Sequence, residues 1–271
     1  MRIMSTHLKR WITAVVIVPA LFTAIIYGPA ILFSVIVMLL VLGGIFEYNT
    51  MVFNQGAHME KGEGLLLGLF IPVAAYVGNI TAMFAMTTFA VIIVFLLFLF
   101  HAKEGLIDLS GLTKVVFGLI YIPFMLSYII LMRQSDAGVQ WVFFIIVLAF
   151  CGDVSAYYVG KSIGKRKLMP AVSAGKTVEG TLGLIIGSIV GCIVYALFFF
   201  RELPLFHVII MAFMGSILGQ LGDLCESTIK RYFAVKDSGF LFPGHGGVLD
   251  RLDSLIFIIP FVYYYTTLVI Q

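Results

Sequence analysis

Charged residues are what this sequence most lacks. Asp, Glu, Lys and Arg make up 11% of its 271 residues, against roughly 25% in ordinary soluble domains. Hydrophobic residues make up 61%, and the mean hydropathy is +1.10. A soluble fold of this length would expose a very large apolar surface. The composition therefore excludes a soluble globular enzyme, a disordered chain and a nucleic-acid-binding module, and it favours a polytopic protein embedded in a lipid bilayer.

Cysteine is also scarce. Cys151, Cys192 and Cys225 each stand alone in apolar sequence, and no CxxC pair occurs. Isolated cysteines of this kind are usually small buried hydrophobic residues. We therefore expect no metal site built on cysteine.

Long apolar runs dominate the chain, and a membrane-spanning helix needs about 20 such residues. Nine candidate runs cover residues 11–27, 29–53, 65–78, 82–100, 115–132, 141–159, 179–200, 207–230 and 253–270. The third run is short, and the first is expected to be a retained helix rather than a cleaved leader. The sequence predicts an all-α bundle of about nine transmembrane helices. We divide it into N-terminal helices (1–140) and a C-terminal catalytic region (141–271) with loops 160–178 and 231–252.

The basic residues are distributed asymmetrically between the two sides predicted by this arrangement. With nine spans and a cytoplasmic N-terminus, 15 of the 17 Lys and Arg residues fall on the cytoplasmic side. Only Arg133 and Arg201 fall on the other side. Such an excess is the positive-inside pattern, and it predicts a multi-pass protein of the inner or plasma membrane.

Charge is concentrated in one window: nine of the charged residues (17 basic and 14 acidic in all) lie between Asp223 and Asp253. Asp223, Glu226 and Lys230 are spaced i, i+3 and i+7, so a helix places them on one face. Asp250 and Asp253 form a second pair where the next helix begins. A carboxylate near hydrocarbon costs about 2.5–3.5 kcal/mol, and clustered carboxylates repel one another unless a cation separates them. The two pairs therefore predict a divalent-metal site with oxygen ligands, Mg²⁺ by preference, with a second cation left open.

An alternative for this window is a salt-bridged helix end, with Lys230, Arg231 and Arg251 as counter-ions. We favour the metal because many acids face a small apolar surround. Asp153 stands well inside another apolar run, where an acid is by default functional or paired.

Two polar loops are predicted to lie on the same side of the membrane. The later one contains Lys236, Ser238 and a glycine-rich stretch with His245, Gly246 and Gly247, whose backbone could approach a phosphate closely. The earlier one carries five basic residues in 160–178 and resembles a P-loop only superficially, because Pro170 stands where a glycine is required. Both loops suit an anionic, water-soluble substrate.

Taken together, these motifs resemble the pattern of phosphatidate cytidylyltransferases (CDP-diacylglycerol synthases). The resemblance covers roughly the last 120 residues. It rests on Gly222-Asp223-Leu224-Cys225-Glu226-Ser227, Lys230-Arg231, Lys236-Asp237-Ser238-Gly239, Pro243-Gly244-His245-Gly246-Gly247 and Leu249-Asp250-Arg251-Leu252-Asp253-Ser254, and upstream on Asp153, Ser155-Ala156-Tyr157 and Ser173…Lys176-Thr177…Glu179-Gly180. One motif departs from the family pattern Ser-Pro-Lys-Lys-Thr-Trp-Glu-Gly, because Ala174, Gly175 and Val178 replace Pro, the first Lys and Trp.

The resemblance implies a nucleotidyltransferase that converts CTP and phosphatidate to CDP-diacylglycerol and pyrophosphate. It also implies a homodimer. Glycines at 183, 187, 191, 215 and 219 are spaced for close helix packing, which we expect mainly between helices of this chain, and they support a dimer contact only weakly. The expected catalytic residues are Asp223, Asp250, Lys236, His245 and Arg251. The expected metal ligands, or supports of the ligands, are Asp223, Asp250, Glu226, Asp253 and Asp153. The expected substrate-binding residues are Lys176, Lys230, Arg231, Ser238, Gly246 and Gly247.

Two other functions were weighed against this one. A transporter would place acids near the bilayer midplane and show inverted repeats, whereas most acids here lie at the predicted cytoplasmic boundary. A CDP-alcohol phosphotransferase would carry Asp-Gly-x-x-Ala-Arg, which this sequence lacks.

Overall fold

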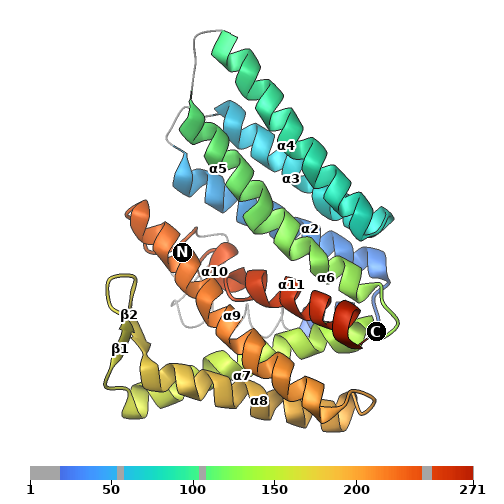
Figure 1. The fold of residues 1–271 in the computed structure, drawn as a ribbon, viewed down its shortest axis with the longest axis vertical. Coiled ribbons are helices and arrows are strands. Elements are labelled where there is room, and N and C mark those ends of the chain that lie inside the picture. The colour runs from blue at the N-terminus through green and yellow to red at the C-terminus, as the bar shows by residue number, and fades with distance from the viewer. Residues whose placement is uncertain (1–18, 54–57, 104–107, 240–245, 271) are drawn as a thin grey trace, which may run out of the picture. The chain divides into compact units, whose positions relative to one another are not determined.

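The computed structural model describes residues 19–53, 58–103, 108–239 and 246–270 (Figure 1). Residues 19–26 are helical. The elements that follow are α2 (Ala30–Val52), α3 (His58–Val77), α4 (Ile80–Lys103), α5 (Leu109–Leu119), η1 (Ile120–Phe124), α6 (Met125–Arg133), α7 (Gly138–Ile163), β1 (Lys167–Met169), β2 (Ser173–Thr177), α8 (Val178–Phe199), α9 (Leu205–Tyr232), α10 (Leu249–Leu252), α11 (Leu255–Tyr265) and η2 (Thr266–Ile270). The two η segments are π-helical, and together with the α-helices they make the described part a helical membrane protein with very little sheet.

Seven helical segments in the described part are long and apolar enough to cross a membrane. They cover Ala30–Val52, Ile80–Lys103, Leu109–Arg133, Gly138–Ile163, Val178–Phe199, Leu205–Tyr232 and Leu249–Ile270. The polytopic all-α class is thus confirmed, whereas the count of about nine is not. The first predicted run, 11–27, is described only from residue 19 onward. The third corresponds to α3, whose first turns carry Glu60, Lys61 and Glu63 and leave a short apolar stretch.

One of these segments changes its helical form at a proline. Between α5 and α6 the five residues of η1 are π-helical, and they contain Pro123. Proline lacks a backbone N–H and clashes with the carbonyl four residues earlier. A local π-turn absorbs this without ending the helix, so Leu109–Arg133 remains one membrane-length segment.

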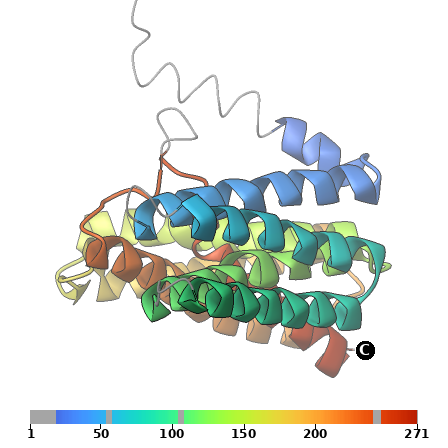
Figure 2. The same cartoon turned by 90° about the horizontal axis from the view of Figure 1, so that it is seen from above.

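The chain divides into two compact units, of which the first comprises residues 1–134 and 237–251. Its helices α2, α3 and α4 lie side by side in chain order (Figure 2). The hydroxyl of Tyr48 donates to the carbonyl of Lys114 over 3.0 Å, and the amide of Asn49 donates to the carbonyl of Lys61 over 3.1 Å. Residues 237–239 and 246–251, which we grouped with the C-terminal region on sequence, pack within this unit.

The second unit comprises residues 135–236 and 252–271, and its most extensive helix contact joins α7 and α8 (Figure 1). Glycines on α8 make that contact close. A Cβ atom added at Gly183 would lie 2.7 Å from Val159, and one at Gly191 would lie 2.7 Å from Cys151. Small residues at these positions therefore let two helix backbones approach each other.

A β-hairpin that the sequence did not predict forms within loop 160–178. Strands β1 and β2 pair antiparallel, with Lys167 opposite Thr177. Thr177 then caps α8, because its Oγ1 accepts the N–H of Gly180 over 3.0 Å. Glu179 accepts the N–H groups of Lys165 and Arg166 over 3.0 and 3.2 Å. These bonds fix the position of the basic hairpin on the end of α8.

The three cysteines are free. Cys192 is buried as expected, but Cys225 is exposed on α9. The expectation that all three are buried is therefore wrong at Cys225, because that position faces outward from a helix of membrane-spanning length.

Candidate active site

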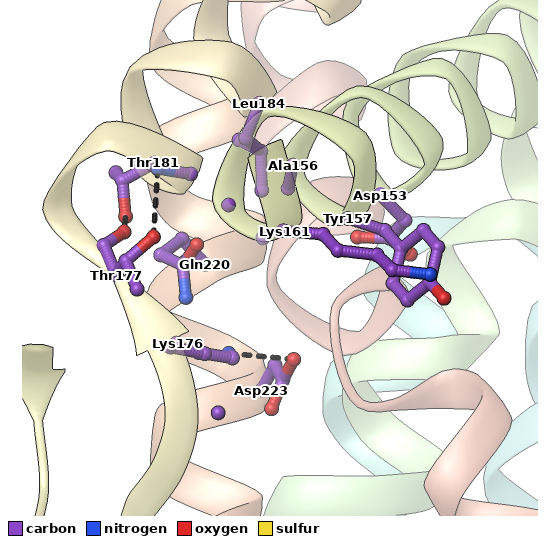
Figure 3. A pocket seen from close by; sticks show the side chains of 14 residues that line it. Asp153, Ala156, Tyr157, Lys161, Lys176, Thr177, Thr181, Leu184, Gln220 and Asp223 are labelled. Atoms are coloured by element: carbon purple, nitrogen blue, oxygen red, sulfur yellow. Dashed lines mark hydrogen bonds and ion pairs between the residues drawn. The ribbon is translucent and has the colours of Figure 1, made fainter. Parts of the chain in front are cut away.

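A cavity of about 430 Å³ opens in the second unit (Figure 3). Helices α7, α8 and α9 and strand β2 contribute its walls. Its lining includes four charged side chains and one amide, which are Asp153, Lys161, Lys176, Asp223 and Gln220. Polar groups gathered in a concave site between membrane-length helices are the expected form of a ligand site.

The centre of the cavity is an ion pair between a strand and a helix. Lys176 on β2 places its Nζ 2.6 Å from Oδ2 of Asp223 on α9. The two side chains are 21% and 31% exposed, and the Nζ atom of Lys176 is covered in this arrangement. Ser227, one turn further along α9, donates to Oδ1 of Asp223 over 3.3 Å. The structure thus brings together two residues that the sequence predicted for the site.

The α7 wall adds a second cation and a second acid. The ammonium group of Lys161 lies 5.6 Å from the centre of the Tyr157 ring, in cation–π range (Figure 3). Asp153 lines the cavity one helical turn before Tyr157. Lys161 was part of the predicted basic loop, and the structure places it on the last turns of α7 instead.

The predicted acids Glu226 and Asp253 have different partners in this unit. Asp253 accepts the N–H of Ser254 over 2.7 Å, and the negative charges of Asp223 and Asp153 act on it. Glu226 is fully buried and forms an ion pair with Lys230 four residues later on α9. Neither Glu226 nor Lys230 lines the cavity.

Arg231 is held by the backbone. Its guanidinium donates to the carbonyls of Val172 and Val235 over 3.2 and 3.1 Å. These bonds tie the hairpin turn to the end of α9, so Arg231 supports the wall of the cavity. Lys236 is exposed.

Asp250 and Ser238 belong to the first unit, where they form one hydrogen-bonded network. Asp250 accepts the N–H of Ser238 over 3.1 Å and the N–H of Gly247 over 2.8 Å. The hydroxyl of Ser238 in turn accepts the N–H of Asp250 over 3.3 Å. These bonds close a tight turn that begins α10.

The sequence analysis missed Glu47, which lies at the base of this network. Glu47 is on α2 and is 2% exposed. Its Oε2 accepts the hydroxyl of Ser238 and the N–H of Leu249, both over 3.0 Å. An acid inside an apolar run is a functional candidate by itself, so Glu47 could have been found from the run 29–53.

The glycines of this loop are sterically required. A Cβ atom at Gly247 would collide with Ser238 and Glu47. Gly246 has a φ of +88°, which side chains rarely adopt, and a Cβ there would lie 3.0 Å from Asp250. The predicted substrate-binding role of these two glycines is untested, and they clearly permit the turn. His245 lies outside the described residues, and Arg251 is exposed.

Within each unit, the described side chains do not supply a full set of ligands for a metal ion. Among the residues that the structure describes, no three His, Cys, Asp or Glu side chains form a group that could hold a metal ion. Mg²⁺ does not need such a group, because it typically binds one or two carboxylates and takes its other ligands from water and substrate phosphates. Asp223 fits that mode because it lines the cavity and is 31% exposed, whereas Glu226 is fully buried beside Lys230.

Fold and cavity together define an integral membrane protein with an ionic site on its transmembrane helices. Residues 8–269 match the cytidylyltransferase family, and the chain belongs to that family. This confirms the resemblance noted in the sequence.

Three curated relatives are called phosphatidate cytidylyltransferase. The chain is 44% identical over 146 residues to the protein of Bacillus subtilis, covering 54% of each chain. It is 40% identical over 135 residues to the protein of Staphylococcus saprophyticus (50% of this chain, 52% of the relative). It is 42% identical over 127 residues to that of Staphylococcus haemolyticus (47% and 48%). The chain thus matches about half the length of these relatives.

Proposed function

We propose that this protein is a phosphatidate cytidylyltransferase, which converts CTP and phosphatidate to CDP-diacylglycerol and pyrophosphate. The observation that carries the proposal is the Lys176–Asp223 pair in a cavity between membrane-length helices. A lipid substrate needs a site reached from the bilayer, and CTP needs one with cations for its phosphates. Family membership and the names of the relatives support the same reaction.

In the proposed reaction, a phosphate oxygen of phosphatidate attacks the α-phosphorus of CTP. A new P–O bond forms, the bond to the β-phosphate breaks, and pyrophosphate leaves with the electron pair. Both reactants are anions, so alignment and neutralisation of charge supply most of the catalysis. Lys176 and Lys161 are placed to neutralise phosphate oxygens in the cavity. The attacking oxygen is already ionised near neutral pH, so the step requires no general base.

We propose Mg²⁺ as the cofactor, with Asp223 as its ligand in the second unit. Asp250 of the first unit stays a proposed ligand on sequence grounds. When bound, the ion would withdraw charge from phosphate oxygens and favour departure of pyrophosphate. The negative charges of Asp153 and Asp253 add to that of Asp223, and together they would attract a cation. For Glu226, paired with Lys230, we propose a supporting role in α9.

The orientation and assembly are proposals too. The positive-inside pattern supports a cytoplasmic N-terminus and a cavity on the cytoplasmic side of a bacterial plasma membrane. A homodimer remains a proposal from the family resemblance.

The test is release of pyrophosphate from CTP by the purified protein in detergent micelles. We expect release only when phosphatidate and Mg²⁺ are both present. Release without phosphatidate, or none under any condition, would reject the proposed reaction. Asp250→Asn should abolish turnover, and Glu226→Gln should reduce it less.

A further inference from the structure

One buried polar group in the cavity has no explanation in the roles given above. Gln220 is on α9, one helical turn before Asp223, and only 8% of it is exposed. Its Nε2 atom is buried and has no hydrogen-bond partner among the described residues. Buried amides are nearly always hydrogen-bonded, because leaving one unpaired is costly. An unpaired amide inside a cavity therefore points to a ligand that supplies the partner.

The side chain of Gln220 is directed into the cavity. Figure 3 shows its amide end pointing toward Lys176 and Asp223. The amide would face the cavity whichever way its oxygen and nitrogen are assigned, since both stand at the end of the same side chain. Gln220 thus presents a neutral donor beside a cation and an anion.

Two other polar side chains nearby already have hydrogen-bond partners. Gln220 also lines a second, very small cavity next to the first one, together with Ser188 and Ser216. The hydroxyl of Ser188 donates to the carbonyl of Leu148 over 2.8 Å, and that of Ser216 donates to Phe213 over 2.8 Å. Gln220 is therefore the side chain of this group that is available to a ligand.

The surroundings favour an anionic oxygen on a lipid. Gln220 lies one turn further from the polar end of α9 than Asp223 does. The helices that flank the cavity carry exposed apolar side chains that suit contact with acyl chains, such as Tyr157 (60% exposed) and Leu182 (57%). A phosphate attached to acyl chains can enter from this side.

We propose that Gln220 binds the lipid substrate by donating a hydrogen bond to an oxygen of its phosphate group. Lys176 neutralises the charge of the phosphate, and the amide of Gln220 sets its orientation without adding charge. Asp223 cannot do this, because an ionised carboxylate only accepts hydrogen bonds. The inference rests on the proposed function. It assigns the amide of Gln220 as the hydrogen-bond donor to the attacking phosphate of phosphatidate.

The test is steady-state kinetics of Gln220→Met, which keeps the length of the side chain and removes the donor. Phosphatidate is varied in mixed micelles at saturating CTP, and CTP is then varied at saturating phosphatidate. We expect the KM for phosphatidate to rise about tenfold or more, as for a lost hydrogen bond to a charged group. The KM for CTP should stay within about twofold. Gln220→Glu, which replaces the donor by a carboxylate, should raise the KM for phosphatidate further.

Ser188→Ala is the matched control. Ser188 is also buried and bonds α8 to α7, but its hydroxyl already has a backbone partner. We expect this variant to lose thermal stability while both KM values remain unchanged. A rise in its KM for phosphatidate equal to that of Gln220→Met would show a general packing effect and overturn the inference.

Two other outcomes would also overturn it. A rise in the KM for CTP alone would assign Gln220 to the nucleotide, and no change in either KM would make the amide structural. If Gln220→Met does not fold, Gln220→Asn replaces it, because the shortened amide should show the same selective rise in KM. The proposed function fails separately, when the unaltered protein releases no pyrophosphate from CTP and phosphatidate. In that case, phosphatidate-dependent thermal stabilisation of the unaltered protein and of Gln220→Met tests the inference by itself.

Discussion

The two units hold their acids in different ways. In the first unit, Glu47 and Asp250 accept hydrogen bonds from the backbone and from Ser238. In the second unit, Asp223 faces a cavity and pairs with the ammonium group of a lysine. The Glu47–Asp250 network and the Lys176–Asp223 pair both place acids beside membrane-length helices. Amino-acid composition alone therefore does not distinguish their roles.

The difference shows what each set can do. Backbone N–H groups cannot move away without changing the turn, so the Glu47 network fixes the conformation of the loop that begins α10. The Lys176–Asp223 pair instead joins two partly exposed side chains that line the cavity. We infer that Glu47 organises the backbone of the first unit, whereas Asp223 and Lys176 face a ligand. For Asp250 the proposed ligand role comes in addition to its bonds to the backbone. Each prediction below could break that distinction.

The largest effect is expected from Asp223→Asn. The substitution keeps the shape of the side chain but removes the charge proposed to hold the metal, so turnover should fall about a thousandfold. Thermal unfolding in detergent should change little, because Asp223 is partly exposed. Asp136→Asn, an exposed acid of the same unit, is the control and should keep full activity. Substantial turnover by Asp223→Asn would remove this residue from the chemistry.

Glu47→Ala should act on stability first. It removes two charge-assisted hydrogen bonds, and we expect a loss of about 2–3 kcal/mol. Amide hydrogen exchange at Leu249 should accelerate, because its N–H loses the acceptor. Asn49→Ala, which breaks a bond between α2 and α3 in the same unit, should destabilise without accelerating exchange at Leu249. Equal acceleration in both variants would show that Glu47 has no specific hold on the loop.

Lys176→Gln should have an intermediate effect. Loss of the cation leaves a phosphate oxygen and Asp223 unneutralised, and we expect about a tenfold drop in kcat/KM, as for a lost charge-assisted hydrogen bond. The salt dependence of kcat/KM should weaken in the variant, since one charged contact is gone. An unchanged salt dependence would indicate that Lys176 serves only to hold β2 against α9.

The smallest effect is expected from Gly175→Lys. Gly175 lines the cavity, and a Cβ atom there would meet nothing within 4 Å. The added cation should be accommodated and should lower the KM for CTP by about two- to threefold, as expected for an exposed charge pair. Ala174→Lys, at an exposed neighbouring position outside the cavity lining, is the control. A rise in KM for CTP would mean that phosphates do not pass this edge of the cavity.

Much of the site was predictable because its residues follow helical spacing. Asp223 and Lys176 were identified from charge within or beside apolar runs, and they meet in the cavity. Glu226 and Lys230 were equally visible, but spacing along one helix does not tell whether a lysine pairs with the acid or a substrate does. In the structure that pair is buried. For these two residues it matches the salt-bridged helix end, the alternative to a metal site in this window.

Contacts between distant parts of the chain were not predictable from local patterns. Ser238 and Glu47 are 191 residues apart, and no periodicity relates them. The hairpin of β1 and β2 was also missed, because strands of three and five residues give too short an alternation to detect. The helical class followed from the apolar runs, but the number of spans depended on polar residues at the start of α3.

The most direct test of the account is the rate of pyrophosphate release, measured in parallel for the unaltered protein, Asp223→Asn and Glu47→Gln. The assay contains CTP, phosphatidate and Mg²⁺ at a temperature where thermal unfolding shows all three proteins to be folded. We predict that Asp223→Asn loses nearly all activity while Glu47→Gln retains a measurable fraction, because its amide oxygen can still accept hydrogen bonds. The reverse order, with Asp223→Asn active and Glu47→Gln inactive, would contradict the assignment of ligand binding to the second unit.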